Sequence, residues 1–305
     1  METSDLLRTI INLPIFSRNL ADEMLAGNFS SIFKGQGMEF DEARHYELGD
    51  DIRSIDWNAS ARFGVPFVKM FREERELTIL ILLDISPSMH RTHIAQQGLS
   101  PYEQALLCTA LIAFSAEHTD QRVGAFLFDR DIEKVFPPRK GRKAIMSIVM
   151  SALQYQNNIM PRRSQYGSDI ASALTGAQRL LKKRSLVVLI SDFFSINWER
   201  EMGSLCRKHD VIAIKISDPN ELPFHGLITL EDPETGARIE APTGLDSFRG
   251  SWANWLEEKS AHWESQCKKS GAAFLKLSTE TDAPSALIKF FGSRTMNRHK
   301  NRKKK

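Results

Sequence analysis

From residue 77 onward, apolar runs alternate with segments whose apolar residues recur every three to four positions. The runs have the length and composition of buried strands, and they cover residues 77–83, 123–128, 132–136, 186–190, 211–216 and 273–277. Between them the helical spacing covers residues 102–117, 144–153, 170–181, 198–208, 248–269 and 284–291. This alternation predicts an α/β fold: an open, mostly parallel, Rossmann-like sheet with helices on both faces.

The first 76 residues have a different pattern. Residues 1–33 show helical spacing interrupted at Pro14, whereas residues 34–76 contain short segments separated by glycines, with aromatic and charged residues alternating. We therefore expect an N-terminal helix and a small β-rich unit over residues 1–76. The α/β domain is expected over residues 77–292, with a β-rich insertion at 217–245 where proline and glycine are frequent.

Composition places the chain among globular proteins. It has 305 residues, of which 42% are hydrophobic, and the longest apolar run is far shorter than the ~20 residues that span a bilayer. The first residues lack a basic segment followed by an apolar one, so no secretory signal is expected. The three cysteines are widely spaced and contain no CxxC, which favours reduced thiols and a cytoplasmic location.

The net charge of +3 hides an uneven distribution. The last thirteen residues, 293–305, contain seven basic and no acidic residues. Without them the chain has 34 basic and 38 acidic residues, a net charge of −4. We expect residues 293–305 to be a disordered, solvated tail, which at most touches nucleic acid or an anionic surface without specificity.

A local acidic excess lies in the N-terminal unit. Seven acidic residues and two arginines occur between residues 39 and 56. The candidates for partner binding are Asp50, Asp51, Arg53 and Asp56. Pairing of Arg44 or Arg53 with these carboxylates inside the unit is the alternative, and we favour it. We also expect Trp57 to pack rather than to stand exposed.

Oxygen-bearing side chains follow three of the predicted strands or loops. Asp84, Ser86 and Ser88 leave the strand at 77–83, Ser168 precedes the helix at 170–181, and Asp192 ends the strand at 186–190. In an open parallel sheet such loops meet at the carboxyl edge, where ligands bind. Carboxylates and hydroxyls suit Mg²⁺, with Mn²⁺ or Ca²⁺ as possible replacements. Helix capping and turn formation are the structural alternatives for the same residues.

These residues resemble the metal-ion-dependent adhesion site of von Willebrand factor A domains. The DxSxS of Asp84 to Ser88, the Ser168-Asp169 pair and Asp192 carry the resemblance. Two positions depart from it, since Ser168 stands where threonine is usual and Phe193 stands where glycine is common. The resemblance implies that all five residues, Asp84, Ser86, Ser88, Ser168 and Asp192, hold the ion, and that Phe193 and Phe194 can crowd the loop.

A second resemblance covers most of residues 30–292. Residues 35–62, GQGMEFDEARHYELGDDIRSIDWNASAR, and residues 217–236, SDPNELPFHGLITLEDPETG, are similar to a bacterial family of unknown function, number 58. That family is found beside MoxR-type AAA+ ATPases. The resemblance implies a non-enzymatic, metal-dependent interaction module. It would bind a MoxR-type ATPase, or a client protein that offers a carboxylate to the metal, in protein maturation or complex assembly.

Enzyme and nucleic-acid functions are the alternatives. The chain has no GxSxG, GxxxxGK[ST] or HExxH motif. A Mg²⁺-dependent phosphoryl-transfer hydrolase with Asp84 as nucleophile remains open, although it would require an acidic residue at position 86, where the chain has serine. The acidic body argues against an extended basic groove, so any contact with nucleic acid would involve only the tail.

Overall fold

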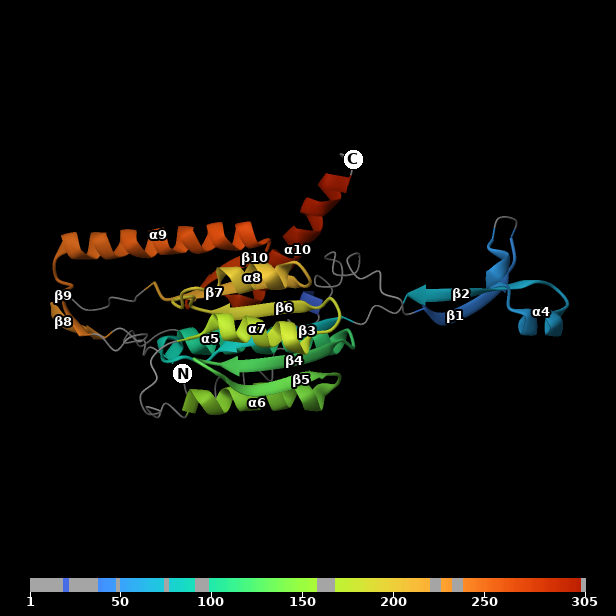
Figure 1. Ribbon diagram of the computed structural model, residues 1–305, viewed down its shortest axis with the longest axis horizontal. Coiled ribbons are helices and arrows are strands. Elements are labelled where there is room, and N and C mark those ends of the chain that lie inside the picture. Colours follow the sequence, from blue (N-terminus) through green and yellow to red (C-terminus); the bar gives the residue numbers. More distant parts are fainter. Residues whose placement is uncertain are drawn as a thin grey trace.

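A six-stranded sheet forms the centre of the computed structural model (Figure 1). The structure describes residues 19–21, 38–47, 50–73, 77–90, 99–157, 168–219, 226–231 and 238–302. The sheet order is β10-β7-β6-β3-β4-β5, and every pairing is parallel except that of β4 with β5. Its strands are β3 (Thr78–Asp84), β4 (Arg122–Phe128), β5 (Ile132–Arg139), β6 (Leu186–Ser191), β7 (Asp210–Ser217) and β10 (Ala273–Ser278).

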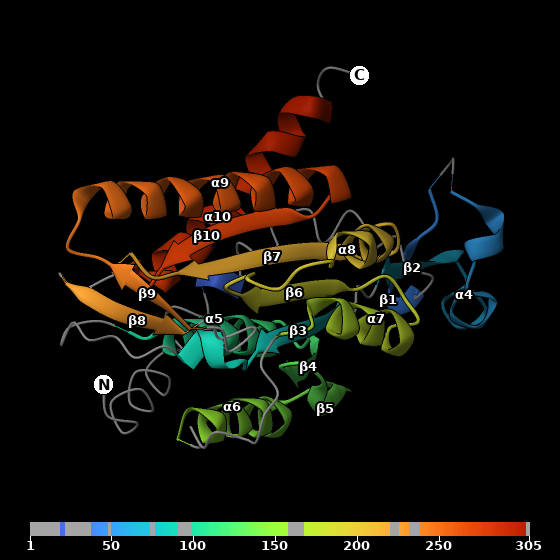
Figure 2. The same ribbon diagram turned by 60° about the vertical axis from the view of Figure 1, so that its left-hand side comes forward.

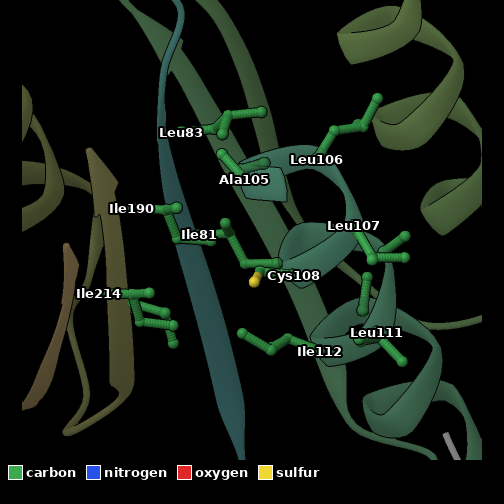
Figure 3. Close-up of a cluster of buried hydrophobic side chains, with 14 of the residues drawn as sticks. Ile81, Leu83, Ala105, Leu106, Leu107, Cys108, Leu111, Ile112, Ile190 and Ile214 are labelled. Atoms are coloured by element: carbon green, nitrogen blue, oxygen red, sulfur yellow. The ribbon is translucent and has the colours of Figure 1, made fainter. Parts of the chain in front are cut away.

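Helices cover both faces of the sheet, which confirms the predicted α/β class. One face carries α5 (Pro101–His118), α6 (Arg142–Asn157) and α10 (Ala283–Arg302). The other carries α7 (Ile170–Leu180), α8 (Glu199–Cys206) and α9 (Asp246–Ser270). Because β3 lies between the two layers, its side chains are buried on both faces. Ile81 and Leu83 pack against α5, as Figure 3 shows, whereas Leu80 and Leu82 pack on the α7 side.

The N-terminal unit contains two antiparallel strands, β1 (Met38–His45) and β2 (Phe67–Glu73). Between them lie the 3-10 helix η2 (Ile52–Ser54) and the helix α4 (Trp57–Phe63), which the glycine-rich pattern did not predict. Asp56 begins α4 by accepting hydrogen bonds from Asn58 N and Ala59 N, and Gly64 ends it in the left-handed conformation. Residues 19–21 are helical, and the remainder of the helix expected within 1–33 lies outside the described residues.

This unit lies beyond the amino ends of the sheet strands in both ribbon views (Figures 1 and 2). The length of the connection explains the placement, because only residues 74–77 separate β2 from the start of β3. Four residues span at most about 14 Å, so the end of β2 stays close to that edge of the sheet. The carboxyl edge, where β3 and β6 end, faces the other way.

The structure adds detail to two predicted segments, the insertion at 217–245 and the C-terminal tail. Within 217–245 the strands β8 (Leu227–Glu231) and β9 (Arg238–Pro242) form an antiparallel pair. Helix α10 continues to Arg302, so residues 293–302 are helical where the sequence analysis predicted a disordered tail. No proline or glycine follows Gly292, and arginine and lysine are good helix formers. Nothing in this local sequence therefore ends the helix. Residues 303–305 lie outside the description.

Candidate metal centre

The strand order reverses at the carboxyl ends of β3 and β6. The chain runs from β3 outward to β4 and β5, then returns to the other side of β3 to form β6, β7 and β10. Leu83 lies opposite Ile190 in the parallel register, so the next residues along, Asp84 and Ser191, end neighbouring strands at the same level. A switch point of this kind is where open α/β sheets bind ligands.

The Asp84 carboxylate is the centre of the cluster and is fully buried. Its Oδ2 accepts hydrogen bonds from Ser168 Oγ at 3.0 Å and from Ser191 Oγ at 2.6 Å. Its Oδ1 accepts one from the backbone N of Ser86 at 2.9 Å. Three segments that are far apart in the sequence therefore meet at one carboxylate.

Ser86 and Ser88 lie beside Asp84 because a tight turn follows β3. The 3-10 helix η3 (Pro87–His90) begins there, and Met89 N donates to Ser86 O at 3.0 Å. This turn brings the two hydroxyls together, with Ser86 Oγ and Ser88 Oγ 3.0 Å apart, and both side chains are fully buried. The DxSxS segment therefore directs one carboxylate and two hydroxyls into the same buried volume.

Ser168 reaches the site from the start of α7. The neighbouring Asp169 caps that helix by accepting a hydrogen bond from Ser172 N at 3.0 Å. Its own backbone N donates to Asp129 O at 2.8 Å, which ties the start of α7 to the loop after β4. Asp169 thus has the capping role that the sequence analysis offered as an alternative, whereas Ser168 contacts Asp84.

Asp192 is the second buried carboxylate, with 4% of its surface exposed. Its Oδ1 accepts a hydrogen bond from Phe194 N at 3.2 Å. It lies close enough to Asp84 for its charge to raise the pKa of that carboxyl. All five predicted metal ligands, Asp84, Ser86, Ser88, Ser168 and Asp192, are therefore assembled at one edge of the sheet.

Phe193 does not cover this cluster, although its position suggested that it would. Its backbone is left-handed, with φ 56°, and its N donates to Ser191 Oγ at 2.9 Å. The ring packs against Trp198 and Trp263, with centroids 5.5 and 5.2 Å away, and is buried in the layer formed by α8 and α9. The left-handed backbone is the physical reason why glycine is suited to this position.

The electrostatics of the cluster favour a cation. Burial is the main cause that raises the pKa of Asp84, followed by the charge of Asp192, while hydrogen bonds from Ser191 and Ser86 lower it. No basic side chain is among the described groups that shift this pKa. Burial makes the charged form of the Asp84 carboxylate costly, and a divalent ion beside it would compensate that charge.

The donor set also matches a hard metal ion. It consists of carboxylate and hydroxyl oxygens, with no thiol or imidazole among the contacts described above, as Mg²⁺ prefers. Within the described ranges no cluster of three or more His, Cys, Asp or Glu side chains forms a metal site. A site here would thus rest on two carboxylates completed by serines, and would leave positions for water or for a partner's oxygen.

Ser191 is the member of the cluster that the sequence analysis did not select. Ser191 shares one face of its strand with Val187 and Leu189, as Asp84 does with Leu80 and Leu82. This alternation was the signal in the sequence that could have pointed to Ser191. Pairing it with Asp84 required the parallel register of β3 and β6, which periodicity alone does not contain.

Two of the four candidates for partner binding, Asp50 and Asp56, act inside the N-terminal unit. Arg44 Nη2 pairs with Asp50 Oδ1 at 2.6 Å, which confirms the internal pairing that we favoured, and Asp56 caps α4. The Arg44 guanidinium and the backbone N of Glu47 hold the pKa of Asp50 below its ordinary value, with Glu47 the larger cause. Asp51 is exposed, and the Arg53 side chain lies outside the described part.

Trp57 corrects one prediction, because 69% of its surface is exposed where packing was expected. It is the first residue of α4, directly after the capping aspartate. No residue of α4 is buried, because the helix lies beside the two-stranded sheet and does not pack on a hydrophobic core.

The three cysteines are free thiols, and Cys108 and Cys267 are buried. Burial raises the pKa of Cys108 to about 12 and that of Cys206 to about 11, so both remain protonated at neutral pH. Across the described helices, none is long and apolar enough to cross a bilayer.

Comparison with known proteins places most of the chain in a described family. The family model described as "Protein of unknown function DUF58" matches residues 42–262. Uncharacterized protein Rv1480 of Mycobacterium tuberculosis and Mb1516 of Mycobacterium bovis are each 29% identical over 278 residues, covering 90% of this chain and 84% of theirs. Uncharacterized protein MAV169 of Mycobacterium avium is 33% identical over 129 residues, covering 41% of this chain and 76% of its own.

Solved structures give weaker matches. The VWA domain of SpRpn10 matches with a TM-score of 0.38 and 13% identity, covering 70% of this chain and 94% of that domain. An uncharacterized membrane-spanning protein from Vibrio fischeri matches with a TM-score of 0.22 and 11% identity, covering 70% and 96%.

Proposed function

We propose that this chain, which belongs to the DUF58 family of proteins of unknown function, is a protein-interaction module that recognises a partner's carboxylate through a divalent metal ion. The observation that carries the proposal is the buried Asp84 carboxylate. It meets hydroxyls from two other segments and the charge of Asp192, with no basic group among the causes of its pKa shift. Mg²⁺ is the ion proposed, and Mn²⁺ or Ca²⁺ would satisfy the same oxygens.

The roles of the side chains follow from their contacts. Asp84, Ser86 and Ser88 would ligate the ion directly, and Ser168 and Asp192 would do so directly or through water. Ser191 would position Asp84 through its 2.6 Å hydrogen bond. When bound, the ion supplies an electrophilic position at which an Asp or Glu of a partner replaces water.

Binding is supported over phosphoryl transfer by the residue two positions after Asp84. Ser86 occupies the position where a hydrolase with Asp84 as nucleophile would require a second acid.

Calorimetric titration of chelator-treated protein with Mg²⁺ and with Mn²⁺ tests the site. We expect saturable binding that Asp84→Asn abolishes, because that change removes the only carboxylate that all three segments contact. Asp169→Asn is the matched control, since it makes the same change one residue from Ser168 and asparagine still caps a helix. Unchanged affinity in Asp84→Asn, or equal losses in both variants, would reject the assignment.

The partner proposed is a MoxR-type AAA+ ATPase or a client brought to it, and family membership is its only support. Co-purification of the full chain with the MoxR-type ATPase of the same organism tests this directly. Retention in Mg²⁺ that is lost with chelator and in Asp84→Asn is the expected result. Retention that is indifferent to both would mean that the ATPase binds elsewhere on the chain.

A further inference from the structure

A row of aromatic rings continues from the candidate metal centre along the first half of α9. Phe194, two residues after Asp192, stacks on Trp255 with centroids 6.4 Å apart. Trp255 contacts Trp252 at 5.1 Å, and Trp252 stacks on Phe248 at 6.3 Å. We call these four residues the aromatic row. It connects the loop that carries a candidate metal ligand to the start of a helix.

This half of α9 is not supported by the core. The helix has 25 residues and is therefore about 37 Å long, but its only buried residues are Trp263 and Cys267, in its second half. No residue from Asp246 to His262 is buried. Figure 1 shows this part extending past the carboxyl edge of the sheet, above β8 and β9.

The row lies on the side of α9 that is turned toward the domain. Phe248, Trp252 and Trp255 are spaced four and three residues apart, so they share a face of the helix. At about 100° per residue, that face adjoins the one that buries Trp263 and Cys267 further along. The apolar face of α9 thus continues beyond the sheet, where there is no longer any sheet to cover it.

Exposed apolar residues and hydrogen-bond donors lie with the row. Ile196, in the loop of Phe194, is 70% exposed, and Trp255 is 38% exposed. Among the described residues, Trp252 Nε1 and Arg249 Nη1 are buried without a hydrogen-bond partner. Lys259 Nζ lies 5.6 Å from the centre of the Trp255 ring. The surface therefore combines aromatic faces with the positive charge of Lys259, and two buried donors lie beneath it.

We infer that the aromatic row and the candidate metal centre form one continuous docking surface for an acidic–apolar peptide segment of a partner protein. The inference rests on the proposed function, because the peptide's carboxylate would occupy the metal position. Its neighbouring aromatic or aliphatic side chains stack on the row, and its acidic groups lie beside the exposed Lys259. Aromatic and arginine side chains near the centre of an interface are the groups that contribute most to its affinity.

A displayed library of random dodecapeptides is the probe. It is selected against the immobilised full chain in Mg²⁺ and eluted with acid, so that elution does not favour metal-dependent binders. Enriched peptides are then synthesised, and their dissociation constants are measured by fluorescence anisotropy. We expect the enriched sequences to share an Asp or Glu flanked by aromatic or aliphatic residues.

Variants separate the two parts of the surface. Trp255→Ala and Ile196→Ser should each weaken binding, the former about tenfold, because they remove apolar contact area beside the metal position. Trp57→Ala is the matched control, since Trp57 is an exposed tryptophan at the opposite end of the molecule, and it should change nothing. Equal circular dichroism spectra check that the variants fold.

Each other outcome has a definite meaning. Carboxylate-dependent binding that Asp84→Asn abolishes but Trp255→Ala and Ile196→Ser leave unchanged would overturn the docking surface and keep the proposed function. Binding that needs Trp255 but neither the carboxylate nor Asp84 would reject the proposed function and the acidic peptide together. Failure to enrich any peptide contradicts the inference.

Discussion

Phe193 holds the candidate metal loop in place at the cost of an unfavourable backbone conformation. A left-handed φ at a residue with a bulky side chain costs about 1–3 kcal/mol. The ring recovers that energy by packing between Trp198 and Trp263, and the backbone N–H is satisfied by the Ser191 hydroxyl, which also contacts Asp84. One residue thus connects the core under α9 to the carboxylate of the site.

Two substitutions at Phe193 separate packing from backbone strain. Phe193→Ala should lower the free energy of unfolding by about 3–5 kcal/mol, because it leaves a cavity. Phe193→Gly should be more stable than Phe193→Ala by about 1 kcal/mol, because glycine adopts a positive φ without strain. Urea unfolding of both variants measures the order. Greater stability of the alanine variant would show that the position does not require a left-handed backbone.

His209 should make stability depend on pH. Only 4% of its surface is exposed, and burial, followed by the charge of Lys208, lowers its pKa from the ordinary 6.5. The folded protein therefore keeps His209 neutral at a pH where the unfolded chain binds a proton. Because the unfolded state binds more protons, this residue destabilises the fold as the pH falls through 6.5.

His209→Gln removes that titration. Its free energy of unfolding should fall less than that of the wild type between about pH 7.5 and about pH 5.5. Urea unfolding at both pH values gives the comparison. Parallel losses in the two proteins would show that other groups account for the acid sensitivity.

At the scale of elements, α10 contributes to the core through its first half. Leu287 and Phe291 are buried against the layer that contains α5, and Ala283 lies beside them. Apart from Lys289, the basic residues of α10 begin only afterward, at Arg294. The helix is therefore a core element whose continuation carries the charge of the C-terminal segment.

Truncation and substitution should act differently on α10. Removing residues 293–305 should shift Tm by less than about 2 °C, because no described core residue is lost. Phe291→Ala should cost about 3–5 kcal/mol, since it opens a cavity beneath the helix. Thermal unfolding followed by circular dichroism compares the two. A large fall in Tm on truncation would mean that the basic segment docks on the domain.

The whole molecule has its candidate centre at one end and its small N-terminal unit at the other (Figures 1 and 2). The centre joins segments that follow β3, precede α7 and follow β6, so its geometry exists only in the folded domain. A ligand that needs all three segments binds the folded state alone, and therefore stabilises it by mass action.

Mg²⁺ should consequently raise the thermal stability of the full chain. At a concentration about 100 times Kd the gain is about 2.7 kcal/mol, which corresponds to a rise in Tm of about 5–10 °C. Asp84→Asn should show no rise, whereas Asp169→Asn should match the wild type. An equal rise in all three proteins would indicate a general salt effect.

Some features of the fold and of the candidate site could be predicted from the sequence, and others could not. The α/β class was predicted from residues 77–291, and the grouping of Asp84, Ser86, Ser88, Ser168 and Asp192 at one edge of the sheet was predicted from the ends of the strands, because buried strands and the polar residues that follow them leave a local pattern. The exposure of Trp57 was not predicted, since it depends on whether other elements lie beside α4. The helical continuation of residues 293–302 was missed because the prediction followed the basic composition of the segment rather than its helix propensity.

Within residues 77–291 the sequence by itself therefore determined which segments are strands, which are helices, and which side chains end them, because hydrophobic period and chemical type are local properties. The tertiary structure alone decided that Ser191 meets Asp84, that Phe193 turns into the core and that α9 carries its aromatic row past the sheet. The register of the strands, the direction in which the Phe193 ring points and the extension of α9 beyond the sheet all arise from packing between segments distant in the chain. No periodicity within one segment encodes them.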